Sequence, residues 1–104
     1  MRTLIHIIPT LQNGGAETVL SRLVEELSEE GLTQFIITIQ GTTNDFHYAK
    51  VSNYAKVLDY KKNFNLVTET ILKNPEAPIL AWMYPSILFS HRIKYRLKTS
   101  NPII

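Results

Sequence analysis

Four short apolar runs, rich in β-branched residues, predict the strands of this chain. The first, residues 3–8, is almost continuously apolar and ends at Pro9, a pattern that is typical of a buried parallel strand. The other three predicted strands are shorter and are bounded by glycine, proline or polar residues; they cover residues 35–39, 55–60 and 78–84.

The segments between these runs change to a helical period. Apolar residues spaced three and four apart predict a helix from Ala16 to Glu30, and Gly31 follows where a C-terminal cap glycine belongs. A second helix is expected from Phe64 to about Leu72, with Asn63 or Asn65 as its cap and Pro75 after its end, and a third is expected from a Ser86 cap to about Lys98. Residues 42–52 are polar and ambiguous, and Asp45 is a candidate cap for a short helix there.

Strands that alternate with helices indicate an α/β fold, with a parallel sheet covered by helices on both faces. Such a sheet normally has five or six strands. This chain predicts four, and Ile103 and Ile104 look like the first residues of a fifth. We therefore expect a partial domain, truncated after its fourth strand-helix unit. The alternative is a complete four-stranded domain with a frayed tail.

Composition and charge exclude several classes of protein. The 104 residues fit one domain, and the 44% hydrophobic content is that of a globular chain. There is no cysteine, which excludes a disulfide framework, a zinc ribbon and a thiol nucleophile, and the three histidines are far apart. A net charge of +2 does not predict strong nucleic-acid binding, and no apolar run suits a membrane span or a secretory signal, so a cytoplasmic location is expected.

The segment most suggestive of chemistry is the turn after the first predicted strand, which reads Asn13-Gly14-Gly15-Ala16-Glu17. In open α/β sheets, ligands bind beyond the carboxyl ends of the strands, where unpaired amides at helix N-termini attract anions. Two glycines allow the backbone to approach such a ligand closely. The turn is neither a P-loop nor the dinucleotide fingerprint, because it lacks the Lys-Ser/Thr pair and the third glycine. A purely structural turn is the other interpretation.

Two longer strings give the turn a family context. Residues 5–20, IHIIPTLQNGGAETVL, with Gly31 after the helix, resemble the opening of family 4 glycosyltransferases of the GT-B fold. Residues 81–86, AWMYPS, are similar to the segment that follows the fourth strand in that family. The resemblance implies a Rossmann-like N-terminal domain that shapes the acceptor side of a cleft, while a C-terminal domain, absent from this chain, makes most contacts with the nucleotide sugar.

The resemblance also implies the substrates and the site. A sugar would pass from a nucleotide-sugar donor to a glycan or lipid-linked acceptor in envelope or exopolysaccharide synthesis, without a metal or other cofactor. The donor phosphate or sugar would lie against Asn13, Gly14, Gly15 and Ala16, and the acceptor-side cleft would include Tyr84, Pro85 and Ser86. The implied partners are a C-terminal glycosyltransferase domain or partner chain, and no nucleic acid.

One position departs from the family pattern. Relatives commonly have a histidine where this chain has Pro85, and proline can neither donate a hydrogen bond nor transfer a proton. His91 lies six residues further on and cannot be assumed to replace it. We therefore assign no catalytic residue, expect the chain to be inactive alone, and leave open whether it is part of an enzyme. The alternative is a non-catalytic module that binds a phosphate or sugar or pairs with another chain.

Two further features of the sequence bear on function. His6 lies among aliphatic residues of the first strand, where a hydrogen-bonded core histidine is the expected interpretation. Arg92, Lys94, Arg96 and Lys98 alternate with apolar residues in the last helix. They are either a solvated helix face or a surface attracted to an acidic acceptor or an anionic membrane, which would place the protein peripherally at the inner membrane face.

Overall fold

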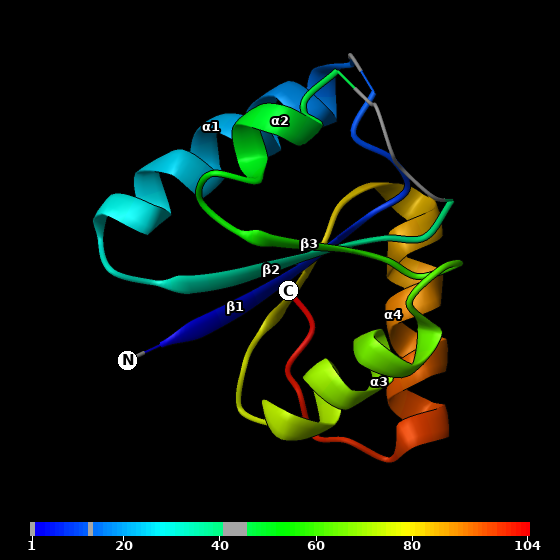
Figure 1. Ribbon diagram of the computed structural model, residues 1–104. Coiled ribbons are helices and arrows are strands. Elements are labelled where there is room, and N and C mark those ends of the chain that lie inside the picture. Colours follow the sequence, from blue (N-terminus) through cyan, green and yellow to red (C-terminus); the bar gives the residue numbers. More distant parts are fainter. Residues whose placement is uncertain (1, 13, 41–45) are drawn as a thin grey trace.

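The computed structural model describes residues 2–12, 14–40 and 46–104, in which four strands alternate with four helices (Figure 1). In chain order the elements are β1 (Thr3–Ile8), α1 (Gly15–Glu29), β2 (Thr33–Thr38), α2 (Tyr48–Val51), β3 (Lys56–Asp59), α3 (Phe64–Lys73), β4 (Ile79–Ala81) and α4 (Met83–Leu97).

The strands form one sheet in the order β3-β2-β1-β4, and every neighbouring pair is parallel. This arrangement confirms the predicted Rossmann-like α/β fold. Ile103 forms a single parallel bridge with Ile79, and the Ile104 amide donates to the Ile79 carbonyl at 2.8 Å. The last residues therefore pair along the outer edge of β4, as the sequence predicts for the beginning of a further strand.

The two faces of the sheet bury separate apolar clusters. Side chains of a strand alternate between the faces, so Ile5 and Ile7 of β1 pack with Val67 and Ile71 of α3. Ile8 lies on the opposite face, and the cluster there is completed from α1 and α2 by Leu20, Val24 and Val51. Figure 1 shows the same division, with α1 and α2 on one side of the sheet and α3 and α4 on the other.

The predicted strand over residues 78–84 is too long at its C-terminal end. The Trp82 amide donates to the Ile7 carbonyl at 2.8 Å, and directly after this bond Met83 takes a φ of 71°, which turns the chain into α4. Ser86 is therefore not the helix cap, because the helix begins three residues earlier. Pro85 fits this first turn because amides at the start of a helix have no partner within the helix, so the missing N–H costs no bond.

The other helix and strand boundaries differ from the predictions by small amounts. Gly31 has a φ of 86° and ends α1 as predicted, and Asn63 occupies the N-cap position of α3 without a side-chain capping bond. β2 begins at Thr33, two residues before the predicted strand, because the Thr33 amide bonds to the Arg2 carbonyl beside β1. α2 forms within the ambiguous segment, and its predicted cap, Asp45, lies outside the described residues.

Candidate functional site

The central feature of the sheet is the point between β1 and β4 at which the order of the strands reverses. From β1 the chain builds outward through β2 to β3, and it then crosses to the other side of β1 to form β4. In open parallel sheets the loops diverge above such a switch point and leave a crevice at the carboxyl ends of the strands. The glycine turn follows β1, and the start of α4 follows β4, so both predicted site segments lie at this edge.

The two glycines of the turn have different surroundings. A side chain at Gly14 would place its Cβ 2.6 Å from Oε1 of Glu17, so the missing side chain makes room for the Glu17 carboxylate. A Cβ at Gly15 would meet no other atom within 4 Å among the described residues. Gly15 therefore leaves open space beside the first turn of α1, and Gly14 does not.

The N-terminus of α1 is held by polar groups from its own first turn. The Gly14 carbonyl accepts bonds from the Thr18 amide at 3.0 Å and from the Thr18 hydroxyl at 2.8 Å. Glu17 is buried in this first turn, where its negative charge is favourable at the positive end of the helix dipole. An incoming anion would therefore have to approach past Gly15 and Ala16, away from this carboxylate.

His47 is a member of this site that the sequence did not predict. Its amide donates to the Leu11 carbonyl at 2.9 Å, which ties the start of α2 to the loop after β1. Its Nε2 lies 3.4 Å from the Thr18 hydroxyl oxygen. Because that hydroxyl already donates to Gly14, the imidazole is the donor in this contact. His47 and the glycine turn are far apart in sequence and adjoin only in the fold, so no spacing pattern could have linked them.

The three residues predicted to line the acceptor side do not share one surface. Tyr84 and Pro85 are exposed in the first turn of α4, and 69% of the Tyr84 surface is accessible. Ser86 is fully buried, and its hydroxyl has no hydrogen-bond partner among the residues that the structure describes. Of the predicted donor-side residues, Gly14, Gly15 and Ala16 lie together at the start of α1, and Asn13 lies outside the described residues.

A buried chain of hydrogen bonds links the beginning of α4 to the middle of α1. The Trp82 indole Nε1 donates to His6 Nδ1 at 3.1 Å, and His6 Nε2 lies 2.9 Å from Oε1 of Gln34. The Gln34 amide nitrogen in turn donates to the Val24 carbonyl at 2.8 Å. Because an indole N–H can only donate, neutral His6 carries its proton on Nε2 and donates it to Gln34.

This network confirms the prediction that His6 is a hydrogen-bonded core residue. Burial lowers the pKa of His6, because the charged imidazolium loses the stabilisation that water would give it, and the bond to Gln34 opposes this effect. A second proton on Nδ1 would also face the Trp82 N–H, which cannot accept it. The neutral form of His6 is therefore part of the native core.

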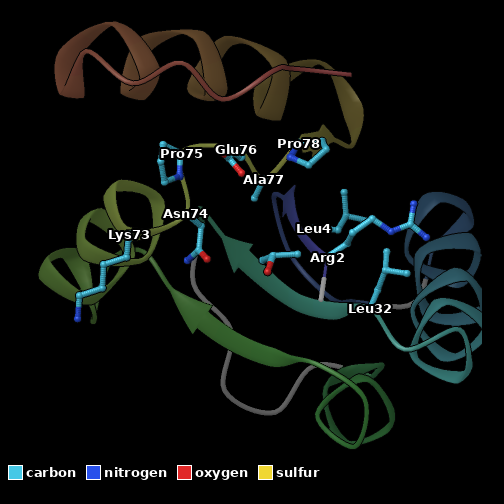
Figure 2. Close-up of a pocket in the computed structure, with 10 residues that line it drawn as sticks. Arg2, Leu4, Leu32, Lys73, Asn74, Pro75, Glu76, Ala77 and Pro78 are labelled. Atoms are coloured by element: carbon cyan, nitrogen blue, oxygen red, sulfur yellow. The ribbon is translucent and has the colours of Figure 1, made fainter.

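A cavity lies at the other edge of the sheet. It has a volume of about 640 Å³ and is lined at the beginnings of β1 and β4, with Arg2 and Lys73 on opposite sides (Figure 2). None of the predicted site residues lines this cavity. It lies at the amino ends of the parallel strands, the edge opposite to the crevice at which such sheets bind ligands.

The described ranges lack two kinds of feature. No group of three or more His, Asp or Glu side chains there is arranged to hold a metal ion. In the same ranges, no helix combines the length and the apolar character that crossing a bilayer requires.

Comparison with known proteins gives no relative for this chain. No family model matches it, and no curated protein or solved structure matches it either. The fold and the site define a Rossmann-like α/β protein with a glycine turn at its switch point. A more specific function rests on this geometry and on the glycine-turn motif in the sequence.

Proposed function

We propose that this chain is the acceptor-side part of a glycosyltransferase and binds the phosphate or sugar of a nucleotide-sugar donor at its glycine turn. The observation that carries the proposal is that α1 and α4, the helices that follow the two strands at the switch point, begin at the same edge of the sheet. Phosphate groups are the common ligand of such an edge, because helix N-termini present free amides and a positive dipole end.

The surroundings of the turn support a ligand on one side only. Glu17 occupies the space beside Gly14, and a carboxylate repels a phosphate. The space beside Gly15 is open, and the backbone amides of Gly15 and Ala16 belong to the first turn, where they have no partner within the helix. His47, whose Nε2 contacts the Thr18 hydroxyl at 3.4 Å, adds a polar side chain beside this first turn.

In this proposal α4 contributes the acceptor side. Exposed Tyr84 stands at the start of α4, where its ring and hydroxyl can contact a glycan or a lipid-linked sugar. A C-terminal domain or a partner chain would supply the remaining contacts with the nucleotide. The acceptor hydroxyl would attack the anomeric carbon of the donor sugar, and the nucleoside diphosphate would leave. We propose that this takes place on the cytoplasmic side of a membrane.

One observation favours the second candidate, a binding module without catalysis. Pro85 occupies the exposed position in the first turn of α4 at which the resembling family commonly has a histidine. A proline there provides no group for proton transfer. The two candidates share the donor site and differ in turnover, so binding and sugar transfer have to be measured separately.

The binding test is a titration of the full chain with a panel of nucleotide sugars, followed by amide chemical shifts. We expect the largest shifts at Gly15, Ala16, Thr18 and His47, together with Tyr84. Gly15→Ala should weaken binding roughly tenfold or more, because its methyl group enters the open space, while the helix itself tolerates alanine there.

Gly31→Ala is the control for this test. It lies at the other end of α1 and introduces a side chain at a φ of 86°, so it should lower stability without affecting donor binding. If Gly15→Ala binds as well as the native chain, or if the shifts cluster around the cavity at Arg2 and Lys73, the proposed donor site is wrong. Sugar transfer in the presence of the C-terminal domain then separates the enzyme from the binding module.

A further inference from the structure

Charge is distributed unevenly along this chain. After Glu76 there are four cationic residues and no acidic one, whereas residues 1–76 hold seven cationic and nine acidic residues. All four of these cations lie in or directly after α4, as Arg92, Lys94, Arg96 and Lys98. The net charge of +2 therefore conceals a strongly basic helix on a slightly acidic body.

The outward side of α4 has an apolar stripe at its centre. Tyr84 and Leu88 are four residues apart and Leu88 and Tyr95 are seven apart, a spacing that places all three on one helix face. All three are exposed, with 86% of the Tyr95 surface accessible and 42% of that of Leu88. Figure 1 shows α4 at the margin of the molecule, with its other side against the sheet and α3.

The four cations lie on both sides of this stripe. The helical period puts Arg92 and Arg96 along one side and Lys94 along the other, and Lys98, directly after the helix, lines the same hollow as Lys94. This shallow hollow of about 790 Å³ adjoins Tyr95 and is lined by His91, Lys94 and Lys98 among others. The basic and apolar residues that alternate in the sequence therefore form, in the helix, an apolar centre with basic residues on both sides. We call this region the α4 outer surface, and it consists of Tyr84, Leu88, Arg92, Lys94, Tyr95, Arg96 and Lys98.

The opposite face of the protein has the opposite charge. α1 covers the other side of the sheet, and four acidic residues, Glu25, Glu26, Glu29 and Glu30, lie in its C-terminal half or directly after it. The molecule is therefore polarised across the sheet, with its basic side at α4. In the field of a negatively charged surface, such a molecule turns this basic side toward the surface.

We propose that the α4 outer surface docks the protein on an anionic lipid bilayer. The tyrosines and Leu88 would lie at the level of the headgroups, where aromatic rings with a polar tip are favoured. The long stems of Arg92, Lys94, Arg96 and Lys98 would lie beside this apolar centre, with their charged ends among lipid phosphates. This inference goes beyond the proposed donor site and does not depend on it.

A second copy of the chain fits this surface poorly. In a two-fold symmetric dimer built on α4, the four cations of one copy would face the four of the other, because the same patch is used on both sides. Like charges brought together in this way repel. An acidic protein is a different class of partner, and the test below distinguishes it from a bilayer.

The experiment measures binding of the full chain to vesicles by cosedimentation. One set of vesicles contains phosphatidylcholine alone, and the other contains phosphatidylcholine mixed with phosphatidylglycerol. We expect binding to the anionic vesicles only, and we expect it to weaken steeply with added salt. Changing Arg92, Lys94, Arg96 and Lys98 together to glutamine should lower the partition coefficient roughly a hundredfold or more.

The matched control changes four other exposed cations, Arg22, Lys56, Lys61 and Lys62, to glutamine, which gives the same net charge. It should keep most of the binding. For the apolar centre, Leu88→Ser with Tyr95→Ser should reduce binding, whereas Val19→Ser with Leu72→Ser, which are exposed on α1 and α3, should not. Far-UV circular dichroism verifies that each variant is folded.

Several results would overturn the proposal. Equal binding to neutral vesicles would remove the role of lipid charge, and equal losses in the two quadruple variants would show that net charge, not α4, is responsible. Binding to soluble polyglutamate but not to anionic vesicles would identify the surface as a site for an acidic polypeptide. Vesicle binding needs no nucleotide sugar, so its failure is distinguishable from failure of the proposed donor site.

Discussion

α1 and α4 are two helices of 15 residues that follow neighbouring strands and begin at the same edge of the sheet, yet their ends are built differently. α1 has Gly14 and Gly15 at its beginning, and the left-handed residue after its end is Gly31. At both ends of α4 a residue with a side chain takes a positive φ, 71° for Met83 and 55° for Lys98. Such conformations cost of order 1 kcal/mol or more in a residue other than glycine.

The inward sides of the two helices differ as well. α1 buries Leu20 and Val24 completely, beside Glu17 and Ser21, whereas the buried residues of α4 are Ile93, Ser86 and Ser90. α4 therefore gains less from apolar burial and also carries strain at both ends. α1 therefore combines apolar burial with glycine at its ends, whereas α4 keeps strained residues next to the side chains of the proposed acceptor side and membrane surface.

The largest expected effect comes from the apolar inner side of α1. Leu20→Ala should lower the free energy of unfolding by about 3 kcal/mol, because it leaves a cavity in a fully buried position. Urea unfolding followed by circular dichroism measures this value. Ser90→Ala on the inner side of α4 should cost clearly less, and equal losses at the two positions would contradict the comparison.

The next effect concerns the polar link between the two helices. Trp82→Phe keeps an aromatic ring at the start of α4 but removes the N–H that His6 accepts, so a buried acceptor loses its partner. We expect a loss of about 1–2 kcal/mol in the free energy of unfolding. His91→Phe, a change of an exposed histidine on α4, serves as the control and should have little effect. If Trp82→Phe leaves the free energy of unfolding unchanged, the hydrogen-bonded link does not stabilise the fold.

The same network makes stability depend on pH. Burial lowers the pKa of His6 in the folded state below its ordinary value of 6.5, so the unfolded chain binds the proton more readily. This contribution to stability is present above pH 6.5 and is lost as the pH falls below it, with a slope of at most about 1.4 kcal/mol per pH unit. The difference in urea midpoint between the native chain and His6→Gln, followed from pH 7.5 to 5.5 in this window, should shrink toward low pH.

The sequence predicted most of the fold because the strands carry their own signal. The apolar runs of residues 3–8 and 35–39 lie largely in two mostly buried parallel strands, β1 and β2, and Gly31 ends α1 for the reason that the sequence suggested. The start of α4 was not predictable in this way. Trp82, Met83 and Tyr84 continue the apolar pattern of β4, and the strand ends only because Met83 takes a φ of 71° directly after the bond from Trp82 to Ile7.

The candidate site was predictable only where its residues are contiguous. The glycine turn could be read from five adjacent residues, but the role of Gly14 depends on how the Glu17 side chain folds back against it. His47 joins the site from another element, and its spacing from Thr18 carries no periodicity. The stripe on α4 was not predicted, because the sequence placed Tyr84 in the strand before the helix, and only the structure shows which side of the helix is covered.

The smallest effect tests the helix ends themselves. Lys98→Gly should raise the free energy of unfolding by up to about 1 kcal/mol, because glycine adopts a φ of 55° without strain. Gly31→Ala at the corresponding end of α1 should lower it by about the same amount, because alanine is strained at a φ of 86°. Urea unfolding midpoints at constant pH measure both changes in the free energy of unfolding. If the two changes in the free energy of unfolding have opposite signs, α4 ends in a strained lysine at the position where α1 has glycine. If Lys98→Gly lowers the free energy of unfolding, the lysine side chain itself stabilises the end of α4.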